Sequence, residues 1–427
     1  MIKKPLSAPS ASLLSIGEEL LLGEITDTNS QFLSQKLRTH GIKVIQMETT
    51  GDELETIVSL FKRALARSDF LFSTGGLGPT ADDLTTEAFA KALGVELEYH
   101  PEVMENVANR LKRPVSSFSE SNRKQGWIPK GALILKNDWG TAPGIYFPSK
   151  EGKHVFLLPG VPHEMKNLFN ERILPILQSL DLKSTVAIKS LHTFGIPESV
   201  IGDRIKPFMM AGLNPDVGTR YGAGIITVRL VATGSSEKEA QEILQPVLNQ
   251  IRTELADGLY GEDDDTLASV TLKALVDRKI TVSAAESLTA GGLCAKLVEI
   301  PGASASLMGG AVVYSNASKV EVCGVKSGTL MAHGAVSPET AAELAQGIRE
   351  RFKSDIGIGI TGIAGPAGGS DLKPVGLVYF GVATLAGVEV LERRWTGLAR
   401  NLIRERAILQ GLDLIRRTAL GEKPLAK

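Results

Sequence analysis

The sequence predicts a mixed α/β protein in which parallel sheets are covered by helices. Short apolar runs alternate along most of the chain with segments of helical spacing, and short links join them. This order is typical of parallel sheets with helices packed on their faces. Glycine-rich turns follow several of the apolar runs. Because ligands bind beyond the carboxyl ends of such strands, we expect the functional residues in and beside these turns.

Length and composition indicate an ordinary globular chain of two or three domains. The chain has 427 residues, whereas a single hydrophobic core stops growing at roughly 250–300 residues. Hydrophobic residues make up 43% and charged residues 22%, which are typical fractions for a globular protein. The net charge of −1 gives no global electrostatic reason to bind nucleic acid, so we expect no direct contact with it.

Nothing in the sequence predicts a membrane segment or a disulfide framework. No apolar run reaches the length of about 18 residues that a membrane helix needs. The apolar run near the start is interrupted by Glu18 and Glu19, so we expect no signal peptide. The two cysteines, Cys294 and Cys323, are expected to pack as small apolar residues. We therefore expect a cytoplasmic protein.

The first segment, residues 1–178, is predicted as a parallel sheet with helices. Its predicted strands cover 11–17, 42–50, 69–76 and 154–160. Its predicted helices cover 30–41, 53–68 and 161–180. Each strand is a short apolar run that ends in or near a glycine, and each helix has an apolar face.

The middle segment, residues 179–260, is predicted as a small α+β unit. Its predicted strands cover 184–195 and 225–234, and its predicted helices cover 197–210 and 236–258. It contains neither a concentrated basic patch nor an aromatic platform, which weakens a nucleic-acid role. We expect the acidic run 262–265 that follows to be a solvated linker; a metal site is the less favoured alternative.

The third segment, residues 261–427, is again predicted as α/β layers. Its predicted strands cover 280–285, 310–316, 355–362 and 375–385. Its predicted helices cover 266–279, 337–352 and 400–417. Ser337 is expected to cap the second of these helices, with Pro338 in its first position.

A turn of small residues, AAESLTAGG (284–292), lies between a predicted strand and a helix. Such a turn exposes backbone N–H groups at a helix N-terminus, which favours an anion. Ser287 is the candidate nucleophile in this turn, and it needs a base. His333 does not lie in a comparable setting and is expected at the surface.

Tyr314 and Lys319 are the candidate partners of Ser287. In VVYSNASKV the predicted strand ends at Tyr314, and Lys319 follows it closely. A lysine whose pKa is lowered by burial, or a tyrosine beside it, can take a proton from a serine. The alternatives are an interface aromatic at Tyr314 and a solvated charge at Lys319.

A second glycine-rich turn follows the strand that Thr361 ends, in GIGITGIAGPAGGSDLKPVG (357–376). Gly362 and Gly365 let the backbone approach a ligand closely. Two cations in TGLARNLIRERA, Arg400 and Arg404, favour a phosphate there. A mobile surface loop is the alternative.

In the first segment, STGGLGPTADD offers Gly75 and Gly76 for a phosphate and two carboxylates, Asp82 and Asp83, for Mg²⁺. The alternative for both carboxylates is that they complement a helix dipole. Polar residues that follow the first strand are expected on the same edge: Glu18, Asp27 and Asn29. The pair His163–Glu164 lacks a second histidine at metalloprotease spacing, which excludes that class.

These motifs together resemble the competence/damage-inducible protein CinA family over the whole chain. The third segment resembles the family's C-terminal domain through AAESLTAGG, VVYSNASK, HGAVSPETA, TGIAGPAGGSDLKPVG and GLARNLIRERA. The first segment resembles its molybdopterin-binding-like domain through GEELLLGEITDTNS, STGGLGPTADDLT, GTAPG and LPGVPHEM. The middle segment stands where the family has a KH-type domain.

The resemblance implies two activities and a set of site residues. It implies nicotinamide mononucleotide (NMN) deamidation at the C-terminus without a cofactor, and ADP-ribose hydrolysis at the N-terminus with a divalent metal. The catalytic residues that it implies are Ser287, Tyr314, Lys319 and Thr361. The substrate-binding residues that it implies are Glu286, Thr289, Gly291, Gly362, Gly365, Arg400 and Arg404, with Gly75, Gly76, Thr80 and Asn29 in the first segment. The metal ligands that it implies are Asp82 and Asp83.

This chain departs from the family pattern at two places. Ala290 stands where many members have glycine, and GLAR is one residue longer than the family's usual motif. The second departure leaves open which of Arg400 and Arg404 is functional.

We expect a homodimer. Two alternatives to the bifunctional enzyme are an N-terminal domain that binds a pterin or nucleotide without catalysis, and an interaction protein in DNA uptake or recombination.

Overall fold

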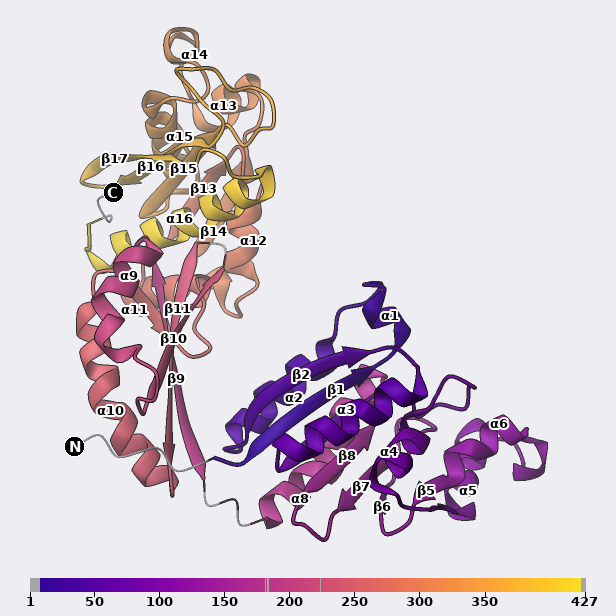
Figure 1. The fold of residues 1–427 in the computed structure, drawn as a ribbon. Helices are drawn as coiled ribbons and strands as arrows, with labels where there is room; N and C mark the ends of the chain where they lie inside the picture. The colour runs from indigo at the N-terminus through magenta and orange to yellow at the C-terminus, as the bar shows by residue number, and fades with distance from the viewer. Residues whose placement is uncertain (1–7, 181, 183, 223, 424–427) are drawn as a thin grey trace. The chain divides into compact units, whose positions relative to one another are not determined.

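The computed structural model describes residues 8–180, 182, 184–222 and 224–423 (Figure 1). The chain divides into two compact units. The first comprises Met1–Ile188, Ala211–Asp216 and Val231–Pro246, and the second comprises Lys189–Met210, Val217–Leu230 and Val247–Lys427. The basic opening of the sequence, residues 1–7, lies outside the described residues.

The first unit contains a six-stranded sheet with the order β2-β1-β3-β8-β7-β6. Its strands are β1 (Ser10–Ile16), β2 (Lys43–Thr50), β3 (Phe70–Thr74), β6 (Leu133–Leu135), β7 (Gly144–Pro148) and β8 (His154–Leu158). The first four in the sheet order run parallel, and β7 and β6 pair antiparallel at one edge. The carboxyl ends of β1, β3 and β8 therefore meet at one edge of the sheet.

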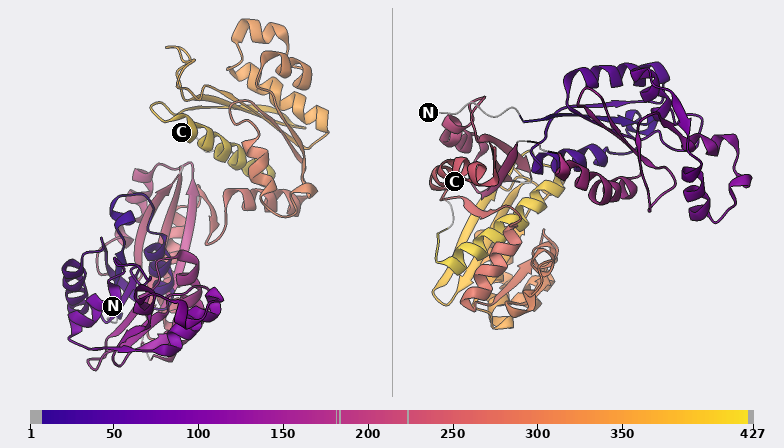
Figure 2. Two further views of the ribbon diagram at one scale, coloured as in Figure 1. Left: turned by 90° about the vertical axis from the view of Figure 1, so that its right-hand side faces the viewer. Right: turned by 90° about the horizontal axis from the view of Figure 1, so that it is seen from below.

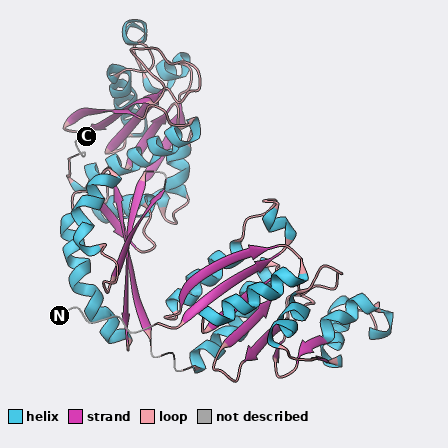
Figure 3. Cartoon of the chain, viewed as in Figure 1, coloured by secondary structure: helices cyan, strands magenta, loops and turns pink. Residues whose placement is uncertain are grey.

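Helices cover both faces of this sheet, as the continuously buried strands β1, β3 and β8 require (Figure 3). One core contains side chains of α3 (Leu54–Arg67) and α4 (Thr85–Leu93), and the other contains those of α2 (Thr28–Thr39) and α7 (Pro162–Leu168). The remaining elements are α1 (Glu18–Leu21), β4 (Leu97–Tyr99), α5 (Pro101–Leu111), α6 (Glu120–Arg123), β5 (Trp127–Pro129) and α8 (Leu174–Ser179).

The middle of the chain forms a four-stranded sheet with the order β10-β11-β9-β12. Its strands are β9 (Thr185–Phe194), β10 (Asp216–Gly222), β11 (Ile225–Gly234) and β12 (Leu259–Glu262), and its helices are α9 (Glu198–Ile205) and α10 (Glu237–Glu254). The expected solvated linker at 262–265 is wrong for its first two residues. Arg252 donates to both carboxylate oxygens of Glu262, and Lys189 pairs with Asp263, because both acids lie against basic side chains of this unit.

The C-terminal sheet has the order β14-β13-β15-β16-β17. Its strands are β13 (Val282–Glu286), β14 (Leu307–Val312), β15 (Ile356–Gly362), β16 (Leu377–Thr384) and β17 (Gly387–Arg394). The first three in the sheet order are parallel, and β16 and β17 add an antiparallel hairpin. We did not predict β17, whose charged, largely exposed sequence has no apolar run.

Helices also cover the C-terminal sheet on both faces (Figure 2). The larger core holds side chains of α11 (Leu267–Arg278), α12 (Gly292–Val298) and α16 (Arg400–Leu420). The smaller core, on the other face, holds those of α13 (Asn316–Cys323) and α15 (Pro338–Phe352); α14 (Ser327–His333) precedes α15. Ser337 caps α15 by accepting a hydrogen bond from the Thr340 amide, which confirms the predicted helix start.

The two cysteines behave as expected from the sequence. Both are free, and Cys323 is buried in the smaller core of the C-terminal domain. Burial raises the pKa of Cys294 to about 12 and that of Cys323 to about 11, so neither is a reactive thiolate at neutral pH. None of the helices in the described residues has an apolar stretch that could cross a bilayer.

Candidate active site

Ser287 and Thr361 lie side by side at the carboxyl edge of the C-terminal sheet. The strands β13 and β15 are parallel neighbours in which Glu286 pairs with Ile360, so the next residue of each strand is at the same level. The Ser287 amide donates to the Ile360 carbonyl at 3.0 Å. Ser287 is 8% exposed and Thr361 is 1% exposed. The register of the two strands therefore places Ser287 and Thr361 at the same level of the edge.

Lys319 reaches this point from α13 and is 1% exposed. Its Nζ donates to the carbonyls of Val313 at 2.8 Å and Tyr314 at 2.9 Å, and lies 3.4 Å from the Ser287 hydroxyl oxygen. Burial lowers the pKa of Lys319, because the charged amine is deprived of water. A neutral amine can donate to both carbonyls and direct its lone pair at the hydroxyl. The arrangement can therefore take a proton from Ser287.

The predicted strand end at Tyr314 is wrong by two residues. The strand β14 ends at Val312, because Ser315 accepts a hydrogen bond from the Ser318 amide and starts α13. Tyr314 is 62% exposed, and its ring hydroxyl has no hydrogen-bond partner within residues 8–423 as far as they are described. The structure brings the Tyr314 carbonyl, and not its hydroxyl, to Lys319.

The N-terminus of α12 does not present all its N–H groups to a ligand, which corrects our expectation for this turn. The carboxylate of Glu286, 1% exposed, accepts hydrogen bonds from the amides of Leu293 at 3.0 Å and Cys294 at 2.9 Å. A carboxylate at this position complements the helix dipole, so the protein supplies its own anion there. Glu286 thus fixes the turn from inside and does not face solvent.

The loop that follows Ser287 still offers polar groups without protein partners. In the described part of the chain, the amides of Leu288 and Thr289 have no acceptor, and the buried Thr289 hydroxyl has no partner. Ala290 adopts φ 53°, in the left-handed region that favours glycine. This conformation accounts for the glycine that many family members have at the position of Ala290. The left-handed conformation costs an alanine roughly 1–2 kcal/mol.

Thr361 is bound to the segment between α14 and α15. Its hydroxyl donates to the Ala335 carbonyl at 2.7 Å. Lys373, from the glycine-rich loop, donates to the carbonyls of His333 at 2.6 Å and Val336 at 2.7 Å. We did not single out Lys373 from the sequence, although it is the one lysine of the motif GGSDLKPVG. The side chain of His333 is exposed, as expected.

The two arginines of α16 have different partners. Arg404 is half-buried and donates from Nε to the Leu288 carbonyl at 2.9 Å and from Nη2 to the Thr289 carbonyl at 3.1 Å. Arg400 is exposed and donates from Nη1 to the Gly365 carbonyl at 2.6 Å. Arg404 thus holds the Ser287 loop, and Arg400 holds the start of the glycine-rich loop with part of its guanidinium.

The edge of the N-terminal sheet is a second candidate site. A Cβ atom on Gly75 would collide with the Ile16 carbonyl, and one on Gly160 would touch Gly75, so the ends of β1, β3 and β8 are in close contact. The Asn29 amide donates to the Gly160 carbonyl at 2.7 Å. Its side-chain oxygen is buried and has no partner in the described residues. This oxygen is therefore left to accept a hydrogen bond from water or from a bound molecule.

The predicted metal ligands lie on an exposed turn beyond this edge. Asp83 accepts hydrogen bonds from the Thr80 amide at 2.8 Å and from the Thr80 hydroxyl, whereas the Asp82 side chain is exposed. The described residues contain no group of three or more histidine, cysteine, aspartate or glutamate side chains that could hold a metal. Mg²⁺ is often held by one or two carboxylates with substrate phosphates and water. Asp82 and Asp83 offer two carboxylates of the kind that such a cation uses, the second of them already bonded to Thr80.

Three family models match successive parts of the chain. The CinA C-terminal domain matches residues 264–419, the Probable molybdopterin binding domain matches 12–179, and the Damage-inducible protein CinA KH domain matches 188–261. A relative from Clostridium kluyveri is 40% identical over 96% of this chain and 100% of its own length. The name of that relative refers to competence and damage induction and to no reaction. This chain belongs to the CinA family.

A second curated relative and a solved structure are also similar to this chain. The CinA-like protein of Kosmotoga olearia is 39% identical over 96% of this chain and 99% of its own length. The crystal structure of competence/damage inducible protein CihA from Agrobacterium tumefaciens is 37% identical and covers 36% of this chain and 94% of its own, with a TM-score of 0.35.

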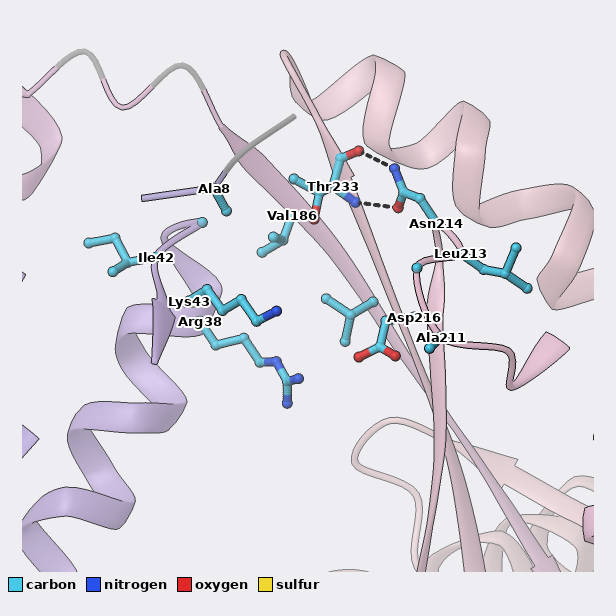
Figure 4. A pocket seen from close by; sticks show the side chains of 13 residues that line it. Ala8, Arg38, Ile42, Lys43, Val186, Ala211, Leu213, Asn214, Asp216 and Thr233 are labelled. Carbon is cyan, nitrogen blue, oxygen red and sulfur yellow. Dashed lines mark hydrogen bonds between the residues drawn. The ribbon is translucent and has the colours of Figure 1, made fainter. Parts of the chain in front are cut away.

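A cavity of about 520 Å³ in the first unit of this CinA-family chain is distinct from both candidate sites (Figure 4). Side chains of Arg38, Lys43 and Asp216 point toward it, and Asn214 closes one side through two hydrogen bonds with the Thr233 backbone. None of the residues that we predicted as site residues lines it.

Proposed function

We propose that the C-terminal domain hydrolyses the carboxamide of NMN to nicotinate mononucleotide and ammonia. The observation that carries this proposal is the buried amine of Lys319, 3.4 Å from the Ser287 hydroxyl. An amide is a poor electrophile, so its hydrolysis needs an activated nucleophile and a stabilised oxyanion. The carboxamide comes from the family resemblance, and the geometry around Ser287 supplies both requirements.

Each group near Ser287 has a role in this reaction. When Ser287 attacks, Lys319 accepts its proton and passes it to the nitrogen as the C–N bond breaks, so that ammonia leaves and water then hydrolyses the acyl ester. The free amides of Leu288 and Thr289 are the donors for the oxyanion. Thr361 has committed its proton to the Ala335 carbonyl, so its oxygen is left to accept the carboxamide N–H. Ser287 either forms an acyl intermediate or directs a water molecule; mass spectrometry of the quenched enzyme distinguishes the two.

The direct test is to incubate the full-length protein with NMN and to measure ammonia and nicotinate mononucleotide. We expect the two products in equal amounts, and we expect no loss of activity when EDTA is present, because no step assigned to these side chains uses a metal. A folded protein that releases no ammonia from NMN would contradict the proposal.

We further propose that Arg400 binds the phosphate of NMN, whereas Arg404 holds the Ser287 loop. Arg400 uses one nitrogen on Gly365 and lies in the first turn of α16, where N–H groups and the helix dipole favour an anion. Arg400→Met should therefore raise KM for NMN about tenfold or more, the effect of losing a charge-assisted hydrogen bond. Arg404→Met should instead lower kcat, because the loop carbonyls lose both donors.

Nicotinamide riboside, which lacks the phosphate, is the control for this pair of variants. If Arg400 binds the phosphate, Arg400→Met should turn over the riboside as the wild type does. An equal rise of KM for NMN and for the riboside would show that Arg400 acts on the loop and not on the phosphate.

For the N-terminal domain we propose hydrolysis of ADP-ribose to AMP and ribose 5-phosphate. The observation that favours it is the buried Asn29 oxygen without a partner, beside the contact of Gly75 with Gly160. Asp82 and Asp83 would hold a divalent cation, which supplies positive charge to the diphosphate when bound. The Asn29 side-chain oxygen orients the diphosphate at the sheet edge, either by accepting a hydrogen bond or by binding the cation.

Asp83→Ala should abolish ADP-ribose hydrolysis and leave ammonia release from NMN unchanged, and EDTA should act in the same selective way. Asp277→Ala, at an exposed ion pair on α11, is the matched control and should affect neither reaction. ADP-ribose or a pterin that binds to the wild type without turnover would favour the non-catalytic alternative. Binding of DNA to the full-length protein would favour the interaction protein and contradict our expectation of no nucleic-acid contact.

A further inference from the structure

Residues 333–336, from the last residue of α14 to the residue before the N-cap of α15, have all four of their backbone carbonyls occupied by side-chain donors. The Gly334 carbonyl accepts from Ser337 at 3.2 Å and from Thr340 at 2.8 Å. These two bonds belong to the start of α15, since Ser337 is its N-cap. The other three carbonyls accept from residues far along the chain, two of them from Lys373 and one from Thr361.

Lys373 is itself held in place. It ends the exposed stretch 366–372 of the glycine-rich loop, and a reciprocal pair of hydrogen bonds fixes it to Ser370: the Ser370 amide donates to the Lys373 carbonyl at 2.9 Å, and the Lys373 amide donates to the Ser370 hydroxyl at 3.1 Å. A charged ammonium bonded to two carbonyls is stronger than two neutral contacts. Lys373 therefore fastens the end of one loop to segment 333–336.

In the sequence, Ala335 lies between His333 and Val336, the two residues whose carbonyls Lys373 binds. The Ala335 carbonyl accepts the Thr361 hydroxyl proton at 2.7 Å, which fixes the rotamer of Thr361 at the edge where Ser287 stands. If segment 333–336 shifts, Thr361 loses this acceptor, and its hydroxyl is free to rotate and to bond elsewhere. The position of Lys373 thus determines the direction in which the Thr361 oxygen can accept a hydrogen bond.

We propose that Lys373 is a positioning residue for the amide hydrolysis, acting through segment 333–336 on Thr361. The inference rests on the proposed deamidation and adds a residue that does not touch the substrate. Lys373 holds the His333 and Val336 carbonyls and so fixes the backbone that carries the Ala335 carbonyl. The Ala335 carbonyl accepts the Thr361 proton, and the Thr361 oxygen is left to accept the carboxamide N–H. The chemical group that Lys373 orients is therefore the primary amide of the substrate, and not its phosphate.

The test is a double-mutant cycle in the full-length protein, with kcat and KM for NMN as the measurements. Lys373→Met should lower kcat about tenfold or more, as the loss of an oriented hydrogen bond to the reacting group does. In a Thr361→Val background the same substitution should have no further effect, because the hydroxyl that it orients is gone. Lys373→Arg, which keeps two donors, should recover most of the activity. Lys326→Met, at an exposed lysine of the same domain, is the matched control and should behave as the wild type.

A second measurement does not depend on turnover. Hydrogen exchange of the peptides that span 333–340 should be faster in Lys373→Met than in the wild type, while that of β13 stays unchanged. Should the methionine variant not fold, Lys373→Gln, which keeps one neutral donor, goes through both measurements.

Three results would overturn the inference: wild-type kcat in the Lys373 variant, an equal loss of kcat with and without the Thr361 hydroxyl, or unchanged exchange in 333–340. If the wild type does not turn over NMN, the proposed function fails, and the exchange measurement alone decides whether Lys373 holds the segment.

Discussion

Lys319→Met should lower the turnover of NMN by about a hundredfold or more, the typical effect of removing a general base. The substitution keeps the length of the side chain and removes its nitrogen, so the Ser287 hydroxyl loses the only basic group within hydrogen-bond reach in the described residues. It also leaves the carbonyls of Val313 and Tyr314 without their donor. The rate of ammonia release at saturating NMN measures the effect.

Three companion variants separate this role from simple packing. Ser287→Ala should lose as much activity as Lys319→Met, because the two groups act as one unit. Lys319→Arg should also be inactive, since a guanidinium stays charged and cannot accept a proton. Lys273→Met, at an exposed lysine paired with Asp277, is the matched control and should keep full activity. Near-normal turnover in Lys319→Met with a normal melting temperature would refute the assignment.

The same assignment fixes the sign of the pH dependence. Burial lowers the pKa of Lys319 below its ordinary value of 10.5. Because only the neutral amine accepts a proton, kcat/KM for NMN should rise with pH and level off before pH 10.5. The lowered pKa also affects stability: the unfolded chain binds this proton more readily, so stability is lost as the pH falls from 10.5 to the pKa of the folded state.

The sequence named Lys319 as a candidate partner of Ser287, because Ser287 lies in a strand-to-helix turn and Lys319 follows the next predicted strand; it left open whether Lys319 is buried or solvated. A strand-to-helix turn after β13 places Ser287 at the sheet edge, and a capped helix start brings Lys319 back toward that edge. The order of strand and helix in the two α/β domains followed from the same alternation. The Ser337 cap was equally visible, since a serine before a proline marks a helix start.

Other features depend on tertiary packing and have no local signal. Nothing in AAESLTAGG shows that Glu286 turns inward to bind the amides of α12 and so takes the place of an external anion. The outward direction of Tyr314 depends on where β14 ends, which Ser315, three residues after the strand end, decides by capping α13. Lys373 finds its two carbonyls across 37 and 40 residues of chain, a separation that no spacing rule reaches.

Asp413→Ala should destabilise the C-terminal domain by about 3–5 kcal/mol, the cost of leaving a buried charge without its partner. Asp413 is 2% exposed and accepts hydrogen bonds from Arg416 and Arg417, each at 2.9 Å. Both arginine side chains are 6% exposed, so they cannot turn to water when the carboxylate is removed. Arg417 also donates to the Asp257 carbonyl at 2.9 Å, which ties α16 to the turn after α10.

Thermal unfolding followed by circular dichroism measures this loss, which corresponds to a melting temperature lower by roughly 10 °C for a domain of this size. Asp277→Ala removes a carboxylate at the same helical spacing from an exposed ion pair of 2.7 Å and should change stability by at most about 1 kcal/mol. Asp413, Arg416 and Arg417 lie near the C-terminal end of α16, whereas Arg400 and Arg404 lie near its start. At temperatures where the Asp413→Ala variant is folded, it should therefore turn over NMN as the wild type does. It should lose activity at its own lowered melting temperature. An unchanged melting temperature would show that the partly exposed Glu422, 3.4 Å from Arg417 and 3.6 Å from Arg416, is enough to compensate both arginines.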